Sequence, residues 1–273
     1  MNSTSSEHYE TMWQDFAKKK SRIYRTDKFT PHNRVGLTNY TREHALLREI
    51  KKVPHSHVLD VGCASGRQVF QIAPFAEKVV GVDIAPTFID ECNAQKKEVG
   101  VSNVSFAVGG FESLPSELFD VVICCEVLEH VIDLEKSIDS LVAKVRSGGH
   151  LIITVPHYNA DGTLWGRMLR LIGVRNFVPL NDFSLEAIVK HGDAHIREFS
   201  QKSLQEKIIP KGFAVAHCST VSHLDGPYGN LLQDFLLSKL PWIRPLFIQL
   251  DRLAEIIVPH CGRHILLVAT KSM

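Results

Sequence analysis

Hydrophobic and polar positions follow strand-like and helix-like patterns in turn from residue 57 to the end of the chain. Short apolar runs predict strands at 57–61, 78–82, 103–108, 119–125, 150–155, 213–221 and 264–270. Helical spacing separates them at 67–75, from Pro86 to Gly100, after Asp133 and after Ser200. This alternation predicts an α/β fold, with a largely parallel sheet that carries helices on both faces.

Three segments interrupt the strand and helix pattern. Residues 1–56 precede the first strand and are interpreted as an N-terminal helical cap. The core at 57–273 carries insertions at 157–199 and 222–262, and the second of these is predicted to form two amphipathic helices broken at Pro241. The sequence shows neither an internal repeat nor a low-complexity linker, so we expect a single domain overall.

The clearest candidate chemistry lies at the end of the first strand, in VLDVGCASGR at 58–67. The strand reaches Asp60, Gly62 allows a tight turn, and Gly66 allows the backbone to approach a ligand closely. Asp83 ends the second strand, where a carboxylate can accept hydrogen bonds from both hydroxyls of a ribose. These features predict a nucleoside site at the carboxyl ends of the strands.

The spacing of glycines argues against a nicotinamide cofactor. Nicotinamide enzymes typically carry the fingerprint G-x-G-x-x-G. If its first glycine is aligned with Gly62, the second and third glycines fall on Ala64 and Arg67, so the fingerprint is absent. A pyrophosphate needs that bare backbone beside a helix N-terminus. A nucleoside cofactor without phosphate places less demand on the loop, so the sequence favours an adenosyl sulfonium.

Four segments in order resemble the consecutive motifs of class I S-adenosylmethionine-dependent methyltransferases. They read VLDVGCASG, VVGVDIAP, FDVVICCEVLEHV and GGHLIITVP. The similarity is greatest to the small-molecule branch that includes the ubiquinone-type O-methyltransferases. It implies a Rossmann-like sheet of seven strands in the order 3-2-1-4-5-7-6, the last antiparallel, with helical lid insertions. It also implies S-adenosyl-L-methionine as the cofactor.

The resemblance assigns expected roles to individual positions. Glu126 and Val127, just past the fourth strand, would face the cofactor and the acceptor pocket. Two positions depart from the family pattern: Ala64 replaces a usual Gly, and Gly110 stands where an Asp often receives the adenine amino group. The positions implied to contact the cofactor, from its methionine end to its adenine, are Asp60, Gly62, Cys63, Gly66, Asp83, Ile84, Gly110, Phe111 and Glu112.

A methyl acceptor that must lose a proton would need a general base, and histidine suits this role because its pKa lies near neutral pH. His130 and His157 lead the candidates by position, since they follow the fourth and fifth strands. His195 is the third candidate, and His191 lies near it. The motifs of metal-assisted O-methyltransferases are absent, and no pair of cysteines forms C-x-x-C, so no metal is expected.

The acceptor is expected to be a small organic molecule, methylated on a hydroxyl oxygen. The apolar insertions, with Trp165, Met168, Phe177 and the helices at 230–258, favour an aromatic, lipidic or glycan-linked compound. N- or C-methylation and a non-catalytic binding subunit are the alternatives. A homodimer interface and contact with a membrane surface are other interpretations of the apolar helices, and the membrane contact is the less favoured.

Charge and cysteine usage narrow the remaining classes. The formal net charge is +1, from 31 basic and 30 acidic residues, which argues against a nucleic-acid partner. The six cysteines are interpreted as reduced thiols. The first residues lack the apolar core of a signal peptide. The sequence therefore predicts a cytoplasmic enzyme.

Overall fold

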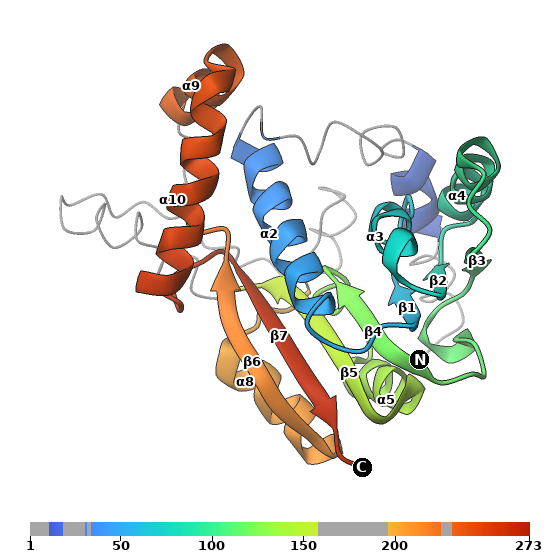
Figure 1. Cartoon of the computed structure of the whole chain (residues 1–273). Helices are drawn as coiled ribbons and strands as arrows, with labels where there is room; N and C mark the ends of the chain where they lie inside the picture. Colours follow the sequence, from blue (N-terminus) through green and yellow to red (C-terminus); the bar gives the residue numbers. More distant parts are fainter. Residues whose placement is uncertain (1–10, 19–30, 32–33, 158–195, 225–230) are drawn as a thin grey trace.

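A seven-stranded sheet forms the centre of the computed structural model, which describes residues 11–18, 31, 34–157, 196–224 and 231–273 (Figure 1). Its order is β3-β2-β1-β4-β5-β7-β6, as the resemblance implied. The pairs from β3 to β5 are parallel, and β7 runs antiparallel to both β5 and β6. The strands are β1 His57–Val61, β2 Lys78–Asp83, β3 Val104–Val108, β4 Phe119–Cys125, β5 Val145–Pro156, β6 Phe213–Val221 and β7 His264–Lys271.

Polar caps fix the ends of several helices. Asp133 accepts a hydrogen bond from the Lys136 N–H at the start of α5, and Ser200 accepts one from the Ser203 N–H at the start of α8. Gly100 ends α4 in the left-handed conformation. The helices are α2 Arg34–Ile50, α3 Arg67–Ile72, α4 Pro86–Val99, α5 Leu134–Lys144, α8 Gln201–Ile208, α9 Leu231–Lys239 and α10 Arg244–Ile257.

Two predicted boundaries were wrong. The helix expected at 67–75 ends at Ile72 and continues as a 3₁₀ turn over Ala73–Phe75, where Pro74 has no N–H to donate. Strand β5 begins at Val145 rather than at His150, because Val145 already pairs with Phe119 before a bulge shifts the register. Ser147, Gly148 and Gly149 therefore lie within β5 instead of ending the helix.

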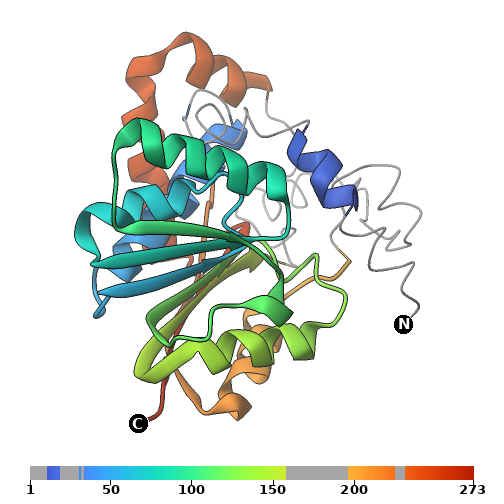
Figure 2. The same ribbon diagram turned by 90° about the vertical axis from the view of Figure 1, so that its right-hand side faces the viewer.

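Helices cover both faces of the sheet (Figures 1 and 2). Alternate residues of each strand point to opposite faces, and this separates two hydrophobic clusters. Helices α5 and α8 bury Ile138, Leu141, Leu204 and Ile208 on one face. Helices α2, α3 and α4 bury the opposite face with Leu46, Ile50, Val69, Ile72 and Ile89. The central strands are mostly apolar because both of their faces are covered.

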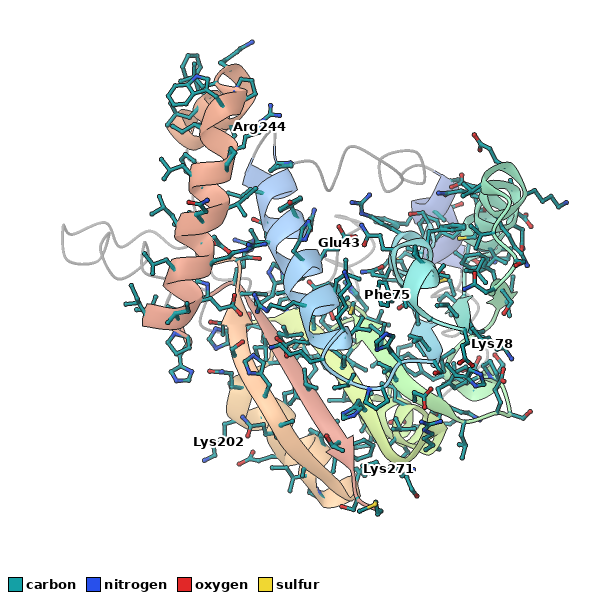
Figure 3. The ribbon with its side chains drawn as sticks, viewed as in Figure 1. Glu43, Phe75, Lys78, Lys202, Arg244 and Lys271 are labelled. Carbon is teal, nitrogen blue, oxygen red and sulfur yellow. The ribbon has the colours of Figure 1, made fainter. Side chains whose placement is uncertain are left out.

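Ion pairs fasten α2 to its neighbours. The Arg67 guanidinium of α3 donates to both carboxylate oxygens of Glu43, at 2.7 and 3.0 Å, and the Glu43 side chain is buried (Figure 3). Arg48 donates to both oxygens of Glu255 on α10, at 3.3 and 2.5 Å. These paired contacts position the N-terminal part of the chain against the core and against α10.

Candidate functional site

The turn after β1 is held against β2 by its backbone. The N–H groups of Gly62 and Cys63 both donate to the Val82 carbonyl, at 2.7 and 3.1 Å. Gly62 has φ +79°, and a Cβ at this position would lie 2.3 Å from Cγ2 of Val127. Two constraints therefore require glycine at position 62: the left-handed backbone conformation and the close approach of the loop after β4.

Asp83 binds the backbone of the same turn. Its carboxylate accepts from the Ala64 N–H at 2.8 Å and from the Ala85 N–H at 2.9 Å. Burial raises the pKa of Asp83, and the two backbone hydrogen bonds oppose that rise. Ala64, which replaces the usual glycine, has φ +44°, a conformation that is costly for a residue with a Cβ. The hydrogen bond to Asp83 helps to hold it there.

Asp60 is an acid buried near the carboxyl end of β1. Among the described residues, its Oδ2 atom makes no hydrogen bond, and the residue is 1% exposed. Burial, with a smaller contribution from the negative charge of Asp83, raises the pKa of Asp60 to about 7. A buried acid of this kind is expensive to ionise unless a cation approaches it. The carboxyl edge of β1 is therefore suited to a positively charged ligand group.

The side chains of the turn itself point into the protein. A Cβ on Gly81 would lie 2.9 Å from the Cys63 Sγ, and burial raises the pKa of the Cys63 thiol. A Cβ on Gly66 would lie 2.9 Å from the Cys92 Sγ and from a ring carbon of Phe106. Cys63 thus faces the core rather than the ligand side, and Gly66 is needed for packing within the protein. The sequence had instead suggested that glycine is needed at position 66 to let the backbone approach a ligand closely.

The residues predicted beside adenine lie after β2 and β3. Ile84 and Phe111 are half-buried, and Phe111 packs on the core cluster that α5 and α8 cover. The Gly110 N–H donates to the Ser113 Oγ at 3.0 Å. A Cβ on Gly110 would lie 2.7 Å from a carboxylate oxygen of Glu112, so the acidic side chain lies over the glycine. An acidic group is thus present near the position where the family often has Asp.

Glu126 belongs to a polar cluster that the sequence did not predict. It has φ +57°, and its backbone N–H donates to the Thr154 carbonyl at 2.8 Å. One carboxylate oxygen accepts from the Thr154 hydroxyl at 3.0 Å. The other lies 3.1 Å from a guanidinium nitrogen of Arg42 and 3.3 Å from Nε2 of His264. Strands β4 and β5 end at this edge, and the antiparallel β7 begins there, so three strands and α2 meet at Glu126.

Replacing Arg42 with Met is expected to lower the free energy of unfolding by roughly 3 kcal/mol, because it leaves a mostly buried carboxylate without its cation. The Arg42 and Glu126 side chains are 12% and 20% exposed. The exposed pair of Lys207 and Glu135 provides a control, and Lys207→Met should change stability by less than about 1 kcal/mol. Urea unfolding measures both variants. Equal effects would show that the Arg42 pair contributes no more than a surface pair.

The two leading histidines both lie at this edge of the sheet. His130 is 8% exposed, its Nε2 lies 3.7 Å from Glu129, and its ring meets the Trp13 ring edge-on with centroids 4.9 Å apart. His157 follows β5 and is equally buried, with its Nδ1 3.2 Å from the Gly262 carbonyl. His191 and His195 lie outside the described residues, as do Trp165, Met168 and Phe177.

The helix at 11–18 contacts the loops that follow β2 and β4. Trp13 lies against His130, and Ala17 is buried with Ala85 and Phe88. Alternation of strands and helices carries no information about a segment that precedes the sheet, so Trp13 and Arg42 could not be predicted as residues of the site. The location of His264 near the site could have been predicted, because an antiparallel last strand must begin at the edge where the parallel strands end.

The family follows from a comparison with protein-family models. Residues 52–188, half of the chain, match the model described as a methyltransferase domain. The chain therefore belongs to the methyltransferase domain family. The matched range includes the turn after β1, Asp83 and the loop after β4, so the family assignment rests on the same residues that form the candidate site.

Curated relatives support the assignment. The chain is 30% identical over 167 residues to a ubiquinone biosynthesis O-methyltransferase of Xylella fastidiosa, covering 55% of this chain and 66% of that enzyme. It is 28% identical over 143 residues to the uncharacterized methyltransferase YcgJ of Bacillus subtilis, covering 51% and 53%. The match thus spans between half and two thirds of these relatives.

Solved structures show the same fold. The N-methyltransferase NodS of Bradyrhizobium japonicum, in complex with S-adenosylhomocysteine, aligns with a TM-score of 0.56 at 15% identity. The alignment covers 95% of this chain and 97% of that one. The predictions of a class I methyltransferase, its seven-stranded fold and S-adenosyl-L-methionine as cofactor are therefore confirmed.

The residues present fit this cofactor. S-Adenosylmethionine carries an ammonium group and a sulfonium, and the buried Asp60 carboxyl is short of a cation. Asp83 has carboxylate lone pairs beyond the two that its backbone bonds use, and these suit the ribose hydroxyls. The contacts of individual residues with the cofactor remain predictions.

Proposed function

We propose that the protein transfers a methyl group from S-adenosylmethionine to a hydroxyl oxygen of a small organic acceptor such as a phenol or a lipid quinol. Several curated relatives are named ubiquinone biosynthesis O-methyltransferase, which supports oxygen as the methylated atom. The observation that carries the proposal is the pair of acids at one sheet edge, with Asp60 needing a cation and Asp83 joined to the adjacent turn.

In this proposal, the bound cofactor supplies an electrophilic methyl group on a good leaving group. The chain's own residues then orient the two reactants and exclude water, which can account for much of the rate enhancement. Asp60 pairs with the methionine ammonium, and Asp83 accepts from the ribose hydroxyls. The residue assignments at Gly62, Cys63, Gly66, Ile84, Gly110, Phe111, Glu112 and Glu126 belong to the same proposal.

His157 is the better placed of the two candidate bases. A carbonyl can only accept a hydrogen bond, so Nδ1 of His157 must carry the proton that it donates to the Gly262 oxygen. In the neutral ring, Nε2 is then the nitrogen that accepts a proton. Burial lowers the pKa of His157, although the bond to Gly262 opposes this. The ring is therefore neutral at physiological pH and ready to receive the proton of a hydroxyl acceptor.

Replacing His157 with Gln is expected to lower kcat by roughly 10²–10⁴-fold and to remove the acidic limb of the pH–rate profile. Because its pKa is lowered, the wild-type rate should persist below pH 6.5 and fall only as the ring becomes protonated. His150→Gln is the matched control: it lies on the same strand, its pKa is also lowered by burial, and it sits at the opposite edge. Release of S-adenosylhomocysteine at each pH gives the rates.

Near-normal activity of His157→Gln, together with an inactive His130→Gln, would move the role of base to His130. Product analysis by mass spectrometry and NMR separates O-methylation from the alternatives of N- and C-methylation. Failure of every phenol, quinol, amine and carbon acceptor, with the cofactor bound, would favour a non-catalytic binding subunit.

The domain organisation is part of the proposal. We propose residues 1–56 as an N-terminal helical cap, of which the helix at 11–18 contacts His130 through Trp13 and α2 contacts Glu126 through Arg42. The proposed core at 57–273 carries insertions at 157–199 and 222–262, and we propose a single domain overall. The reduced state expected of a cytoplasmic protein is consistent with the six free cysteines.

A further inference from the structure

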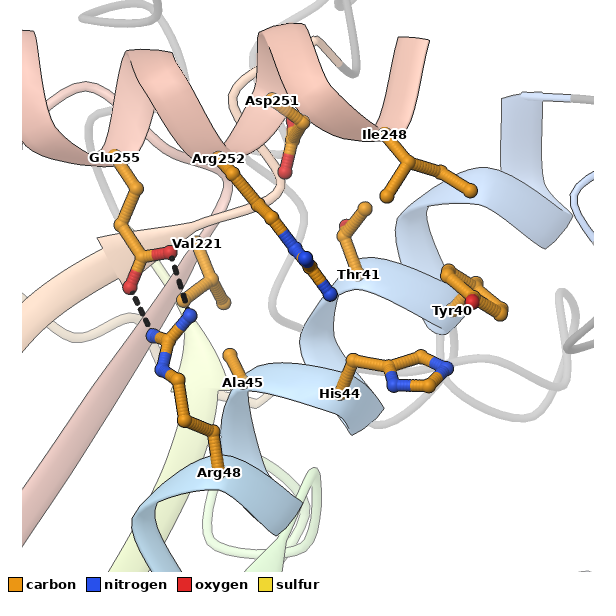
Figure 4. Close-up of a pocket in the computed structure, with 10 residues that line it drawn as sticks. All are labelled: Tyr40, Thr41, His44, Ala45, Arg48, Val221, Ile248, Asp251, Arg252 and Glu255. Atoms are coloured by element: carbon orange, nitrogen blue, oxygen red, sulfur yellow. Dashed lines mark hydrogen bonds and ion pairs between the residues drawn. The ribbon is translucent and has the colours of Figure 1, made fainter. Parts of the chain in front are cut away.

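The segment that connects α10 to β7, residues 258–263, lies against the end of β6. No helix in the part of the chain that the structure describes, α10 included, is long and apolar enough to span a membrane. Glu255 of α10 pairs with Arg48 of α2, and both line a small polar pocket together with Val221 of β6 (Figure 4). Polar contacts thus fix the helix before the segment, and β7 after it lies within the sheet, so the segment is anchored at both ends.

Thr220 of β6 holds this segment with its side-chain hydroxyl, and the residue is fully buried. Its Oγ1 donates to the Pro259 carbonyl at 2.9 Å and accepts from the Gly262 N–H at 2.7 Å. Nε2 of His223 lies 3.3 Å from the same oxygen and must be the donor, because the only proton of the hydroxyl is already used. One proton and two lone pairs are all that a hydroxyl offers, so its hydrogen-bonding capacity is filled.

Gly262 is held on both sides of its Cα atom. Its own N–H donates to Thr220, and the N–H of Arg263 donates to the Ser222 carbonyl at 3.3 Å. A Cβ on Gly262 would lie 2.5 Å from the Val221 carbonyl oxygen, so glycine lets the segment lie this close to β6. Glycine also has the widest backbone freedom of any residue. The direction of the Gly262 carbonyl therefore depends on these two hydrogen bonds.

The Gly262 carbonyl in turn contacts the ring of His157. It accepts from Nδ1 of His157 at 3.2 Å, and the backbone N–H of His157 donates to the Arg263 carbonyl at 2.8 Å. In a neutral histidine, the bond that one nitrogen makes decides which nitrogen carries the proton. The same bond orients the ring, as the third group behind a catalytic base does. The contacts thus lead from the Thr220 hydroxyl through Gly262 to Nδ1 of His157.

We propose that Thr220 is a positioning residue for methyl transfer, because its hydroxyl fixes Gly262 and thereby the orientation and tautomer of His157. The inference rests on the proposed function, in which His157 is the base. Thr220 is buried and acts through Gly262, and its own proton stays in the bond to Pro259. The hydroxyl proton of the acceptor moves to Nε2 of His157, while Nδ1 keeps its bond to the Gly262 carbonyl.

Nitrogen NMR of the full chain with isotope-labelled histidine tests the proposal without an acceptor. The His157 signals are those missing in His157→Gln. We expect the wild-type ring to carry its proton on Nδ1 at neutral pH, and Thr220→Val to show the Nε2–H tautomer as well. The pKa of His157 should also fall further in Thr220→Val, because the bond to Gly262 raises it against burial and the charge of His260. Thr220→Ser keeps the hydroxyl and should restore the wild-type signals.

Kinetics separate a positioning role from a purely structural one. With a phenol or lipid quinol that the wild type methylates, Thr220→Val should lower kcat by roughly 10–100-fold, as misplacement of a base does. The KM for S-adenosylmethionine should stay unchanged, and the acidic limb of the pH–rate profile should move to lower pH. Thr220→Ser should recover most of the rate. Thr270→Val is the matched control with wild-type kcat, since that hydroxyl lies 3.1 Å from Nδ1 of His150, at the opposite edge of the sheet.

The double variant His157→Gln/Thr220→Val completes a cycle, and Thr220→Val should cause no further loss of kcat once His157 is absent. An equal loss in both backgrounds would overturn the proposal, because the change would then act through the fold. Circular dichroism establishes that each variant is folded. A wild-type His157 that carries its proton on Nε2 would overturn the proposal without any variant.

The proposed function and the role of Thr220 can fail separately. An inactive His157→Gln beside a Thr220→Val protein with wild-type kcat and wild-type His157 signals would overturn the positioning role and leave the base standing. A fully active His157→Gln would contradict the proposed base, and with it any role of Thr220 in the reaction.

Discussion

Replacing Asp60 with Asn is expected to make the unliganded protein more stable at pH 8 and to weaken its binding of S-adenosylmethionine. The pKa of Asp60 is raised to about 7, first by burial and then by the charge of Asp83. At pH 8 the folded protein must therefore hold an ionised, buried carboxylate whose Oδ2 lacks a hydrogen-bond partner among the described residues. Asn has nearly the same shape and carries no charge to desolvate.

The sign of the effect follows from proton linkage. The pKa of an unfolded Asp is about 4, so the folded state binds the proton more tightly than the unfolded state does. The stability that this proton contributes is fully present below about pH 4 and is lost as the pH rises through 7. The gain from Asp60→Asn should therefore be small at pH 4 and reach up to about 4 kcal/mol at pH 8.

Urea unfolding at several pH values measures this gain. Asp120→Asn is the matched control, because Asp120 is equally buried but pairs with Arg146 and accepts from the His57 N–H at 2.7 Å. That variant should be less stable than the wild type at pH 8. A destabilised Asp60→Asn protein at pH 8 would show that Asp60 has a partner in the unliganded state.

The same variant should lose affinity for the cofactor by roughly 10–100-fold, the loss expected for one hydrogen bond to a charged group. In the wild type, binding near pH 6 should release a proton, since the cofactor's ammonium favours the ionised form of Asp60. Calorimetry in buffers of different ionisation enthalpy detects that proton. Unchanged affinity, with no proton released, would place the ammonium elsewhere.

Replacing Asp83 with Ala is expected to reduce cofactor affinity by more than about 100-fold, the largest loss of affinity expected for any single change in the site. The variant loses the carboxylate proposed to bind the ribose hydroxyls, and each hydrogen bond to a charged group contributes roughly 1.5–3 kcal/mol. It also frees the N–H groups of Ala64 and Ala85, and Ala64 is left with its positive φ unsupported.

Equilibrium dialysis with labelled S-adenosylmethionine measures the loss at Asp83. Asp90→Ala, an exposed acid on α4 close to the same loop, controls for the change in net charge. If both variants bind as the wild type does, Asp83 serves the turn alone and the ribose is held by another residue.

The parts of the fold that were predictable are those determined by local pattern. All seven strands were identified, because each is a short run rich in apolar residues, and a turn residue such as Gly62 marks where a strand ends. The sheet order came from the resemblance, not from the pattern, since periodicity does not tell which strands are neighbours. The start of β5 was missed because Ser147-Gly148-Gly149 has the composition of a turn, yet a bulge carries the strand through it.

The part of the site that was predictable lies at the ends of two adjacent strands, β1 and β2. Asp60, Gly62 and Asp83 are close in space because β1 and β2 are adjacent, and the order of strands implies this. The environment of Glu126 was not predictable, since Arg42 and His264 lie 222 residues apart and meet only in the folded chain. The packing role of Gly66 was also hidden, because it depends on where Cys92 and Phe106 place their side chains.

The most direct test of the central claim is a calorimetric titration of the wild-type chain with S-adenosylhomocysteine. We predict saturable binding of one molecule per chain with a micromolar dissociation constant, weakened by Asp83→Ala and unaffected by Asp90→Ala. A wild-type protein that binds neither S-adenosylhomocysteine nor S-adenosylmethionine, in the presence and absence of phenol and quinol acceptors, would contradict the proposal that this site holds a methyl donor.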